Sequence, residues 1–178
     1  MKKLIILLML LPIVAFSQSF TKKEIKRFEK VLKRSNSSIR DFKKESLVSV
    51  EKIGNPSLEG LIENALFMAG FEVVSNKVAK KAVNISNEIN ENEQNIEISK
   101  STTYKAVYVI SVSGRYISAI GRCMQALLNF SARIVDLSDE GKLVGTFKYS
   151  GNAMGYVACE EDVANAFSYK LLQLSEAK

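Results

Sequence analysis

The side chains that most often carry out chemistry in proteins are scarce in this chain of 178 residues, and histidine is missing altogether. Without an imidazole there is no serine or cysteine triad with a histidine base, no histidine-ligated zinc and no haem with a proximal histidine. Three features remain that could act chemically or bind a ligand. They are two cysteines, a run of acidic residues near the C-terminus and an excess of lysine and arginine near the N-terminus.

The only thiols of the chain are Cys123 and Cys159. In an exported protein a disulfide between them would persist, but their spacing neither requires nor forbids one, and two buried or free thiols are the alternative. A metal site needs more ligands than two cysteines supply. A nucleophilic cysteine would lack its usual histidine base, so we expect neither a metal nor a cofactor.

A run of carboxylates, Glu160, Glu161 and Asp162, precedes an apolar repeat at helical spacing. Two of these groups could in principle serve glycoside hydrolysis, but acids in the first turn of a helix also complement its dipole, and we favour that role. The backbone of Gly151 and Gly155 could cradle an anion, although a plain connection into the helix needs the same residues. Phosphate-binding, dinucleotide-binding, nucleophile-elbow and calcium-loop motifs are absent. The sequence therefore predicts no catalytic residues and a protein that is not an enzyme.

Positive charge is concentrated in residues 21–45, where ten lysines and arginines face four acids. Such a segment could bind an acidic envelope protein, or an anionic surface such as lipid headgroups or peptidoglycan. A solvated helix face is the plain alternative. Nucleic acid is not expected as a partner, because only Phe28 and Phe42 could stack on bases. The candidate contact residues are Lys22, Lys23, Lys26, Arg27, Lys30, Lys33 and Arg34.

The first residues, Met1–Ser17, have the features of a secretory signal peptide. Two lysines precede a continuous apolar run, Leu4–Leu11, and the small residues Ala15 and Ser17 form a cleavage site before Gln18. The apolar stretch is shorter than the roughly 18 to 20 residues that span a bilayer, and no cysteine follows it to carry a lipid anchor. We therefore expect a periplasmic or secreted protein with no transmembrane span after signal cleavage.

The apolar pattern predicts helices and strands that alternate along the chain. Residues 21–24 form a capping box that opens a helix with one apolar stripe, and residues 35–38 are typical of a turn. A strand at 45–53, a helix at 56–69 and a strand at 71–74 predict a βαβ unit with parallel strands. The remaining predicted elements are a weak helix at the start of the polar region 76–95, a strand at 104–113, a loop at 114–121, a hairpin of 124–137 and 142–149, and a helix at 160–174.

These elements predict an α/β protein of the two-layer sandwich class, with helices packed on a mixed sheet of about five strands. A basic helix and linker, residues 18–45, precede a single domain at residues 46–178. No internal repeat or low-complexity linker divides this domain.

Several segments resemble a group of exported bacterial domains: the curli-secretion lipoproteins, the activators of penicillin-binding proteins and the N-terminal domain of TolB. The resemblance lies in the step into Gly70-Phe71-Glu72-Val73-Val74, the strand at 108–114 and the hairpin segment Ala132-Arg133-Ile134-Val135-Asp136. It implies a small cell-envelope domain that binds another protein, and it carries over no catalytic residue. The anchoring cysteine of the first two branches and the barrel-forming hairpins of the curli channel have no counterpart here, so we expect neither an anchor nor a pore.

We therefore predict a non-enzymatic periplasmic or secreted adaptor or assembly factor that binds envelope proteins through its sheet edge, its basic helix or both. An oligomer is compatible with this prediction. A second hypothesis is a secreted hydrolase or small-molecule binder that uses residues around the loops at 114–121 and 151–155. A third is a protein that binds peptidoglycan or another anionic surface through the basic helix.

Overall fold

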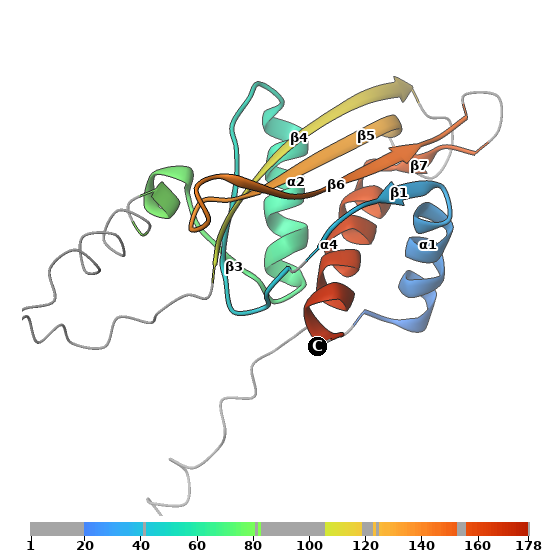
Figure 1. Ribbon diagram of the computed structural model, residues 1–178. Coiled ribbons are helices and arrows are strands. Elements are labelled where there is room, and N and C mark those ends of the chain that lie inside the picture. Colours follow the sequence, from blue (N-terminus) through green and yellow to red (C-terminus); the bar gives the residue numbers. More distant parts are fainter. Residues whose placement is uncertain are drawn as a thin grey trace, which may run out of the picture.

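The computed structural model describes residues 20–40, 42–80, 82, 106–118, 123, 125–152 and 156–177. These residues form a mixed α/β structure in which helices pack on an open sheet, and the predicted fold class is confirmed (Figure 1). The predicted signal peptide and most of the polar region 76–95 lie outside the described residues. The helices are α1 (Lys22–Leu32), α2 (Pro56–Met68) and α4 (Glu160–Glu176), and residues 76–80 are also helical.

Seven strands form the sheet in the described part of the chain, in the order β1-β6-β5-β4-β2-β3, with β7 paired to β5. β2 is parallel to both β3 and β4, as the βαβ prediction requires, whereas β4, β5 and β6 are antiparallel neighbours. The strands are β1 (Ser35–Ser37), β2 (Leu47–Val50), β3 (Glu72–Val73), β4 (Val107–Ser118), β5 (Gln125–Asp136), β6 (Lys142–Ser150) and β7 (Ala158–Cys159).

Two strands are absent from the prediction of about five, and both are short. β1 replaces the turn expected at residues 35–38, because its backbone pairs with β6, with Ser35 opposite Tyr149 and Ser37 opposite Phe147. β7 has only two residues. Neither segment has the apolar alternation by which a strand is recognised in a sequence.

The loop expected at residues 114–121 is also wrong over its first five residues, because β4 continues to Ser118. Gly114 pairs with Phe130 on β5. A Cβ atom at position 114 would lie 2.8 Å from a methyl carbon of Leu127 and 3.0 Å from one of Leu58. This glycine therefore marks a close approach of two leucine side chains to a strand, and its presence does not indicate a loop.

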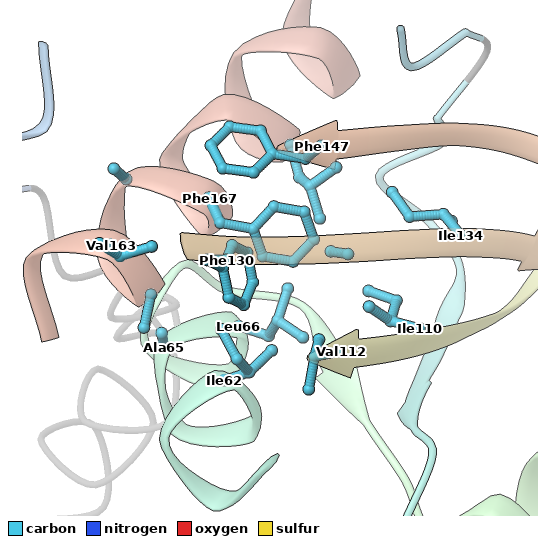
Figure 2. Packing of buried hydrophobic residues seen from close by; sticks show 14 of the residues in the cluster. Ile62, Ala65, Leu66, Ile110, Val112, Phe130, Ile134, Phe147, Val163 and Phe167 are labelled. Atoms are coloured by element: carbon cyan, nitrogen blue, oxygen red, sulfur yellow. The ribbon is translucent and has the colours of Figure 1, made fainter. Parts of the chain in front are cut away.

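The hydrophobic core lies between one face of the sheet and the helices α2 and α4 (Figure 2). Alternate residues of each central strand point into it, and on the opposite face Leu47 of β2 and Val107 of β4 are buried against Ala79. α4 lies between α1 and α2 (Figure 1) and contacts both. The fully buried side chains at the centre include Ile110 and Val112 from β4, Phe130 from β5, Phe147 from β6, Ile62 and Leu66 from α2, and Phe167 from α4.

The basic N-terminal segment is built into this same body. Phe28 and Val31 of α1 are 1% and 0% exposed, and Phe42 is 1% exposed. After β1, the chain continues along β6, where the Ser38 amide donates to the Thr146 carbonyl at 2.9 Å. Gly145 permits this approach, because a Cβ atom there would meet the backbone of residues 38 and 39. α1 is therefore a fixed part of the structure.

Candidate binding surface on the first helix

α1 begins at the capping box that the sequence predicts. The backbone amide and the hydroxyl of Thr21 donate to Glu24 Oε2 at 2.8 Å and 2.7 Å, and the Glu24 amide donates back to the Thr21 hydroxyl at 3.3 Å. These bonds stabilise the charged carboxylate and lower the pKa of Glu24. The Thr21 side chain has the larger effect and its backbone amide the smaller one. The cap fixes the residue from which the helix starts and therefore fixes which side chains lie on each of its faces.

The inner face of α1 is held by aromatic packing. The Phe28 ring meets Phe20 edge-on, with centroids 5.1 Å apart, and lies 5.9 Å from the ring of Tyr169 on α4. Phe20 also meets Tyr169 edge-on at 5.8 Å. Edge-on pairs place the positive ring edge against a negative ring face, which stabilises this geometry beyond simple burial.

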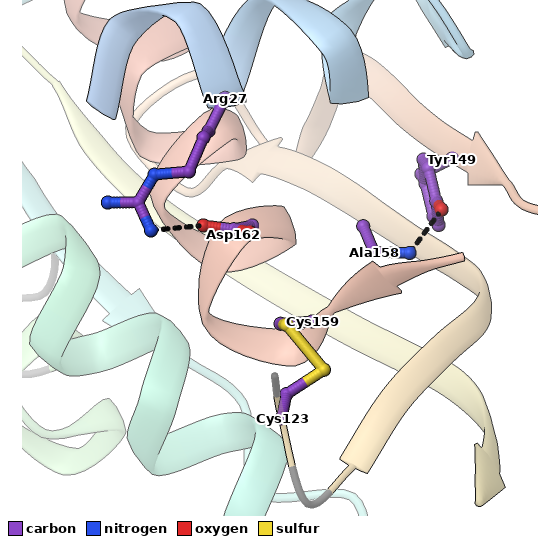
Figure 3. Close-up of a disulfide and its surroundings, with 6 residues drawn as sticks. All are labelled: Arg27, Cys123, Tyr149, Ala158, Cys159 and Asp162. Carbon is purple, nitrogen blue, oxygen red and sulfur yellow. Dashed lines mark hydrogen bonds and ion pairs between the residues drawn. A yellow bond between two sulfur atoms is a disulfide. The ribbon is translucent and has the colours of Figure 1, made fainter. Parts of the chain in front are cut away.

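One of the seven predicted contact residues points inward. Arg27 Nη1 lies 3.6 Å from Oδ1 of Asp162, in the first turn of α4 (Figure 3). The side chain of Arg27 is 33% exposed and that of Asp162 only 12%. This pair binds α1 to α4, so Arg27 acts as a structural residue, and Asp162 acquires a partner besides the helix dipole.

The outer face of α1 carries the other predicted cations. Lys22, Lys23, Lys26, Lys30 and Lys33 are all exposed, and within the described ranges none of them forms an ion pair. Lys22, Lys26 and Lys30 follow one another at intervals of four residues, so like charges are neighbours on the helix surface. We call the face formed by Lys22, Lys26, Lys30 and Lys33 the outer lysine face.

At the end of α1 the basic surface turns toward the edge of the sheet. The guanidinium carbon of Arg34 lies 4.9 Å from the centre of the Tyr156 ring, a cation–π contact that holds the side chain in place. Lys30, Lys33, Arg34 and Tyr156 line a shallow pocket there. The three cations of this pocket are predicted contact residues, whereas Tyr156 carries no signal in the sequence that would have indicated it.

The two cysteines form a disulfide beside this region (Figure 3). Cys159 is the residue at the N-terminal end of α4, and the Cα atoms of Cys123 and Cys159 are 5.7 Å apart. Close by, the Tyr149 hydroxyl accepts a hydrogen bond from the Ala158 amide at 2.9 Å (Figure 3). Burial raises the pKa of Tyr149, so its hydroxyl stays protonated through neutral pH.

A small polar cluster that the sequence analysis missed lies at the first turns of α2 and α4. The Tyr116 hydroxyl is beside the Glu160 carboxylate and the Asn55 side chain, and burial followed by the charge of Glu160 raises the pKa of Tyr116. Next to it, Glu59 is 1% exposed and accepts backbone N–H groups of residues 53, 54 and 55 at 2.7 to 3.1 Å. Burial raises the pKa of Glu59, but these donors outweigh it and the net pKa is lowered. The Tyr116 hydroxyl can donate a hydrogen bond, while Oε1 of Glu59 is occupied by three backbone donors.

A groove of about 280 Å³ runs between α1 and α2. Its apolar lining comes from Phe20, Leu61, Ala65 and Met68, and its polar lining is Glu24, Asn64, Glu161 and Asn165. Glu161 is thus placed at a groove wall, while Glu160 lies in the tyrosine cluster and Asp162 under α1. The three adjacent acids are therefore turned toward three different surroundings. In the described part of the chain, no group of three or more acidic or cysteine side chains could hold a metal ion.

No protein-family model matches the chain, and no curated protein matches it. Among solved structures, the chain is similar to a dodecameric PelC variant from Paraburkholderia phytofirmans. The two sequences are 12% identical, the TM-score is 0.39, and the alignment covers 79% of this chain and 92% of the PelC chain. Within the described residues, no helix has the length and apolar character needed to cross a membrane.

Proposed function

We propose that the chain is an exported, non-enzymatic adaptor of the bacterial cell envelope that binds an acidic surface on another envelope protein through the outer lysine face. The observation that carries the proposal is that Phe28 and Val31 fix α1 in the core while four lysines of its other side stay exposed. The signal-peptide pattern of Met1–Ser17 and the resemblance to exported envelope domains support the export and adaptor parts of the proposal.

The arrangement of the lysines argues for a binding role over simple solvation. Like charges four residues apart on a helix destabilise it by roughly 0.2 to 0.5 kcal/mol per pair, and the outer lysine face contains two such pairs, Lys22 with Lys26 and Lys26 with Lys30. A helix face that contacts only solvent is stabilised when side chains of opposite charge alternate along it. Glu29, the one acidic residue of α1 beyond its first turn, lies three residues after Lys26 and four before Lys33 and offsets part of this repulsion, but the face keeps a net positive charge that an acidic partner would neutralise.

A fixed helix also binds with a smaller entropic penalty. The capping box, the aromatic contacts of Phe28 and the Arg27 ion pair hold α1 before any partner arrives. Because the helix does not have to fold on binding, the ordering cost that a disordered basic arm would bear is avoided. Charge complementarity would in addition accelerate association at low ionic strength.

A crosslinking pull-down from cell envelopes tests the proposal. The exported chain is compared with a K22Q/K26Q/K30Q/K33Q variant and with a control, K52Q/K77Q/K80Q/K142Q, which loses the same charge from exposed sites elsewhere. We expect wild type and control to recover the same acidic envelope protein, and the outer-face variant to lose it. Equal recovery by all three would contradict the proposal. Retention on anionic vesicles with no protein recovered would favour the surface-binding alternative.

A further inference from the structure

The face of the sheet opposite α1, α2 and α4, which Ala79 covers at Leu47 and Val107, carries a second group of cations, separate from the outer lysine face. Arg115 on β4, Arg133 on β5 and Lys148 on β6 all belong to this side, because the residues between them, such as Val112, Ile134 and Phe147, point into the core. All three cations are exposed. Within the described ranges, none of them forms an ion pair.

We propose that this open face of the sheet binds an extended acidic polysaccharide. Side chains two residues apart on a strand are separated by about 7 Å and neighbouring strands by about 5 Å, so the three cations form a triangle with sides of roughly 8 to 14 Å. This spread exceeds a single anionic group. It fits acidic groups carried on successive units of a chain that lies across the strands.

The surroundings of the cations favour a carbohydrate. The residues directly opposite the three cations on neighbouring strands carry neutral hydrogen-bonding groups. An acidic residue at each of these positions would instead stabilise the sheet by about 0.2 to 1 kcal/mol per opposite-charge pair. Hydroxyl and amide side chains can bond to sugar hydroxyls, and the guanidinium fork of arginine pairs with carboxylates. These opposing residues are Ser111 across from Arg133, Asn129 across from Arg115, and Ser131 across from Lys148.

The shape of the face provides a place for such a chain. A shallow depression of about 430 Å³ is lined by Arg115, Asn129, Ser131 and Lys148 together with Gly114, and also by Phe130 and Tyr149, which are only 2% and 1% exposed. It lies where the pairing of β4 with β5 shifts its register, directly after Arg115. Irregularities of this kind bend a strand and re-aim its side chains. The depression is open along the sheet, so a linear polymer can enter and leave it.

Other polyanions fit this face less well. The aromatic residues that line the depression, Phe130 and Tyr149, are only 2% and 1% exposed, so nucleic-acid bases would find no accessible ring there to stack on. A protein partner would be expected to place apolar anchors in deep pockets, and this depression is shallow. Among the described residues that line the depression, no apolar side chain is exposed that could insert into a bilayer.

The face carries little negative charge of its own. Among the described residues, the carboxylate that bonds to it is Glu51, which follows β2 and accepts a hydrogen bond from the Ser111 hydroxyl. Glu51 is thus at the border of the face, away from Arg115 and Lys148. Ser111 lies directly opposite Arg133, so Glu51 offsets part of the charge of that arginine, whereas the positive potential of Arg115 and Lys148 is left for a ligand.

Affinity electrophoresis of the exported chain in gels that contain alginate, with pullulan as the neutral control, tests the proposal. The R115Q/R133Q/K148Q variant removes the three cations, and its thermal unfolding is measured first because all three residues are exposed and the fold should persist. We expect alginate to retard the wild type, pullulan to leave it unretarded, and the variant to bind alginate at least about tenfold more weakly. The outer-face variant K22Q/K26Q/K30Q/K33Q, which removes four positive charges against three, serves as the control for net charge and should bind alginate within about threefold of the wild type.

Each other result would overturn the proposal. Equal retardation of wild type and R115Q/R133Q/K148Q would place binding elsewhere, and an equal loss in the outer-face variant would show a response to net charge alone. Retardation by pullulan would show that binding does not require acidic groups on the polysaccharide. Tighter binding to DNA or to anionic vesicles than to alginate would assign the face to another class of ligand. Because capture of an envelope protein is measured separately with the outer-face variant, this proposal and the adaptor proposal can fail independently.

Discussion

The contribution of α1 to stability is concentrated in Phe28, and replacing it with alanine should weaken the whole protein. The side chain is 1% exposed and packs against Phe20 and Tyr169. Truncation of a buried phenylalanine to alanine costs about 3 to 5 kcal/mol, from lost burial and from the cavity left behind. For a domain of this size, 1 kcal/mol corresponds to a shift of roughly 2 to 4 °C in melting temperature, so we expect Phe28→Ala to melt roughly 10 °C below the wild type.

Phe67→Ala is the matched control. Phe67 lies on α2 and is 68% exposed, so the same substitution there should change stability by less than about 0.5 kcal/mol. Urea unfolding followed by far-ultraviolet circular dichroism gives both free energies of unfolding. If Phe28→Ala cost no more than Phe67→Ala, or if α1 melted in a separate earlier transition, the argument that α1 is a fixed part of the domain would be refuted.

Three further predictions concern the disulfide, a buried glutamate and a buried tyrosine. Replacing both Cys123 and Cys159 with serine opens a loop with a sequence separation of 36 and should lower the free energy of unfolding by about 2 to 4 kcal/mol, measured against the wild type under oxidising conditions. Because the folded-state pKa of Glu59 lies below its unfolded-state value, its stabilisation is complete above the unfolded-state pKa and is lost as pH falls through the folded-state pKa. Glu59→Gln should therefore flatten the acid side of the stability profile, and a profile parallel to that of the wild type would exclude this role. Tyr149→Phe leaves the buried Ala158 amide without its acceptor and should cost about 1 to 3 kcal/mol in urea unfolding, whereas an unchanged midpoint would show that another acceptor replaces the hydroxyl.

Local signals in the sequence predicted the elements whose boundaries depend on neighbouring residues. The capping box at Thr21 and Glu24 is formed by residues three apart, so its geometry follows from the helix itself. Gly70 and Gly141 have φ values of +88° and +75°, which glycine adopts without strain, and they end α2 and the turn of the β5–β6 hairpin where expected. The five strands other than β1 and β7 were recognisable for the same reason, because the pattern that indicates each of them lies within one short segment of the chain.

The features that the sequence did not predict depend on residues far away in the chain. β1 is a strand only because β6 lies beside it, more than one hundred residues later. The inward orientation of Arg27 depends on Asp162 of α4. One signal could have indicated it, since Arg27 precedes Phe28 and lies four residues before Val31, at the border of the apolar stripe. The polar cluster of Tyr116 and the cations of the open sheet face become visible only when the strand register is known.

Site-specific photocrosslinking can show whether a partner docks on the outer lysine face. A benzophenone side chain placed at position 26, in the outer lysine face, is compared in living cells with the same group at position 67, which is exposed on α2. Our account predicts an adduct with one acidic envelope protein at position 26 and none at position 67. An adduct at position 67 with none at position 26 would contradict it, because the partner would then dock on α2 and the lysines of α1 would be no more than a solvated surface.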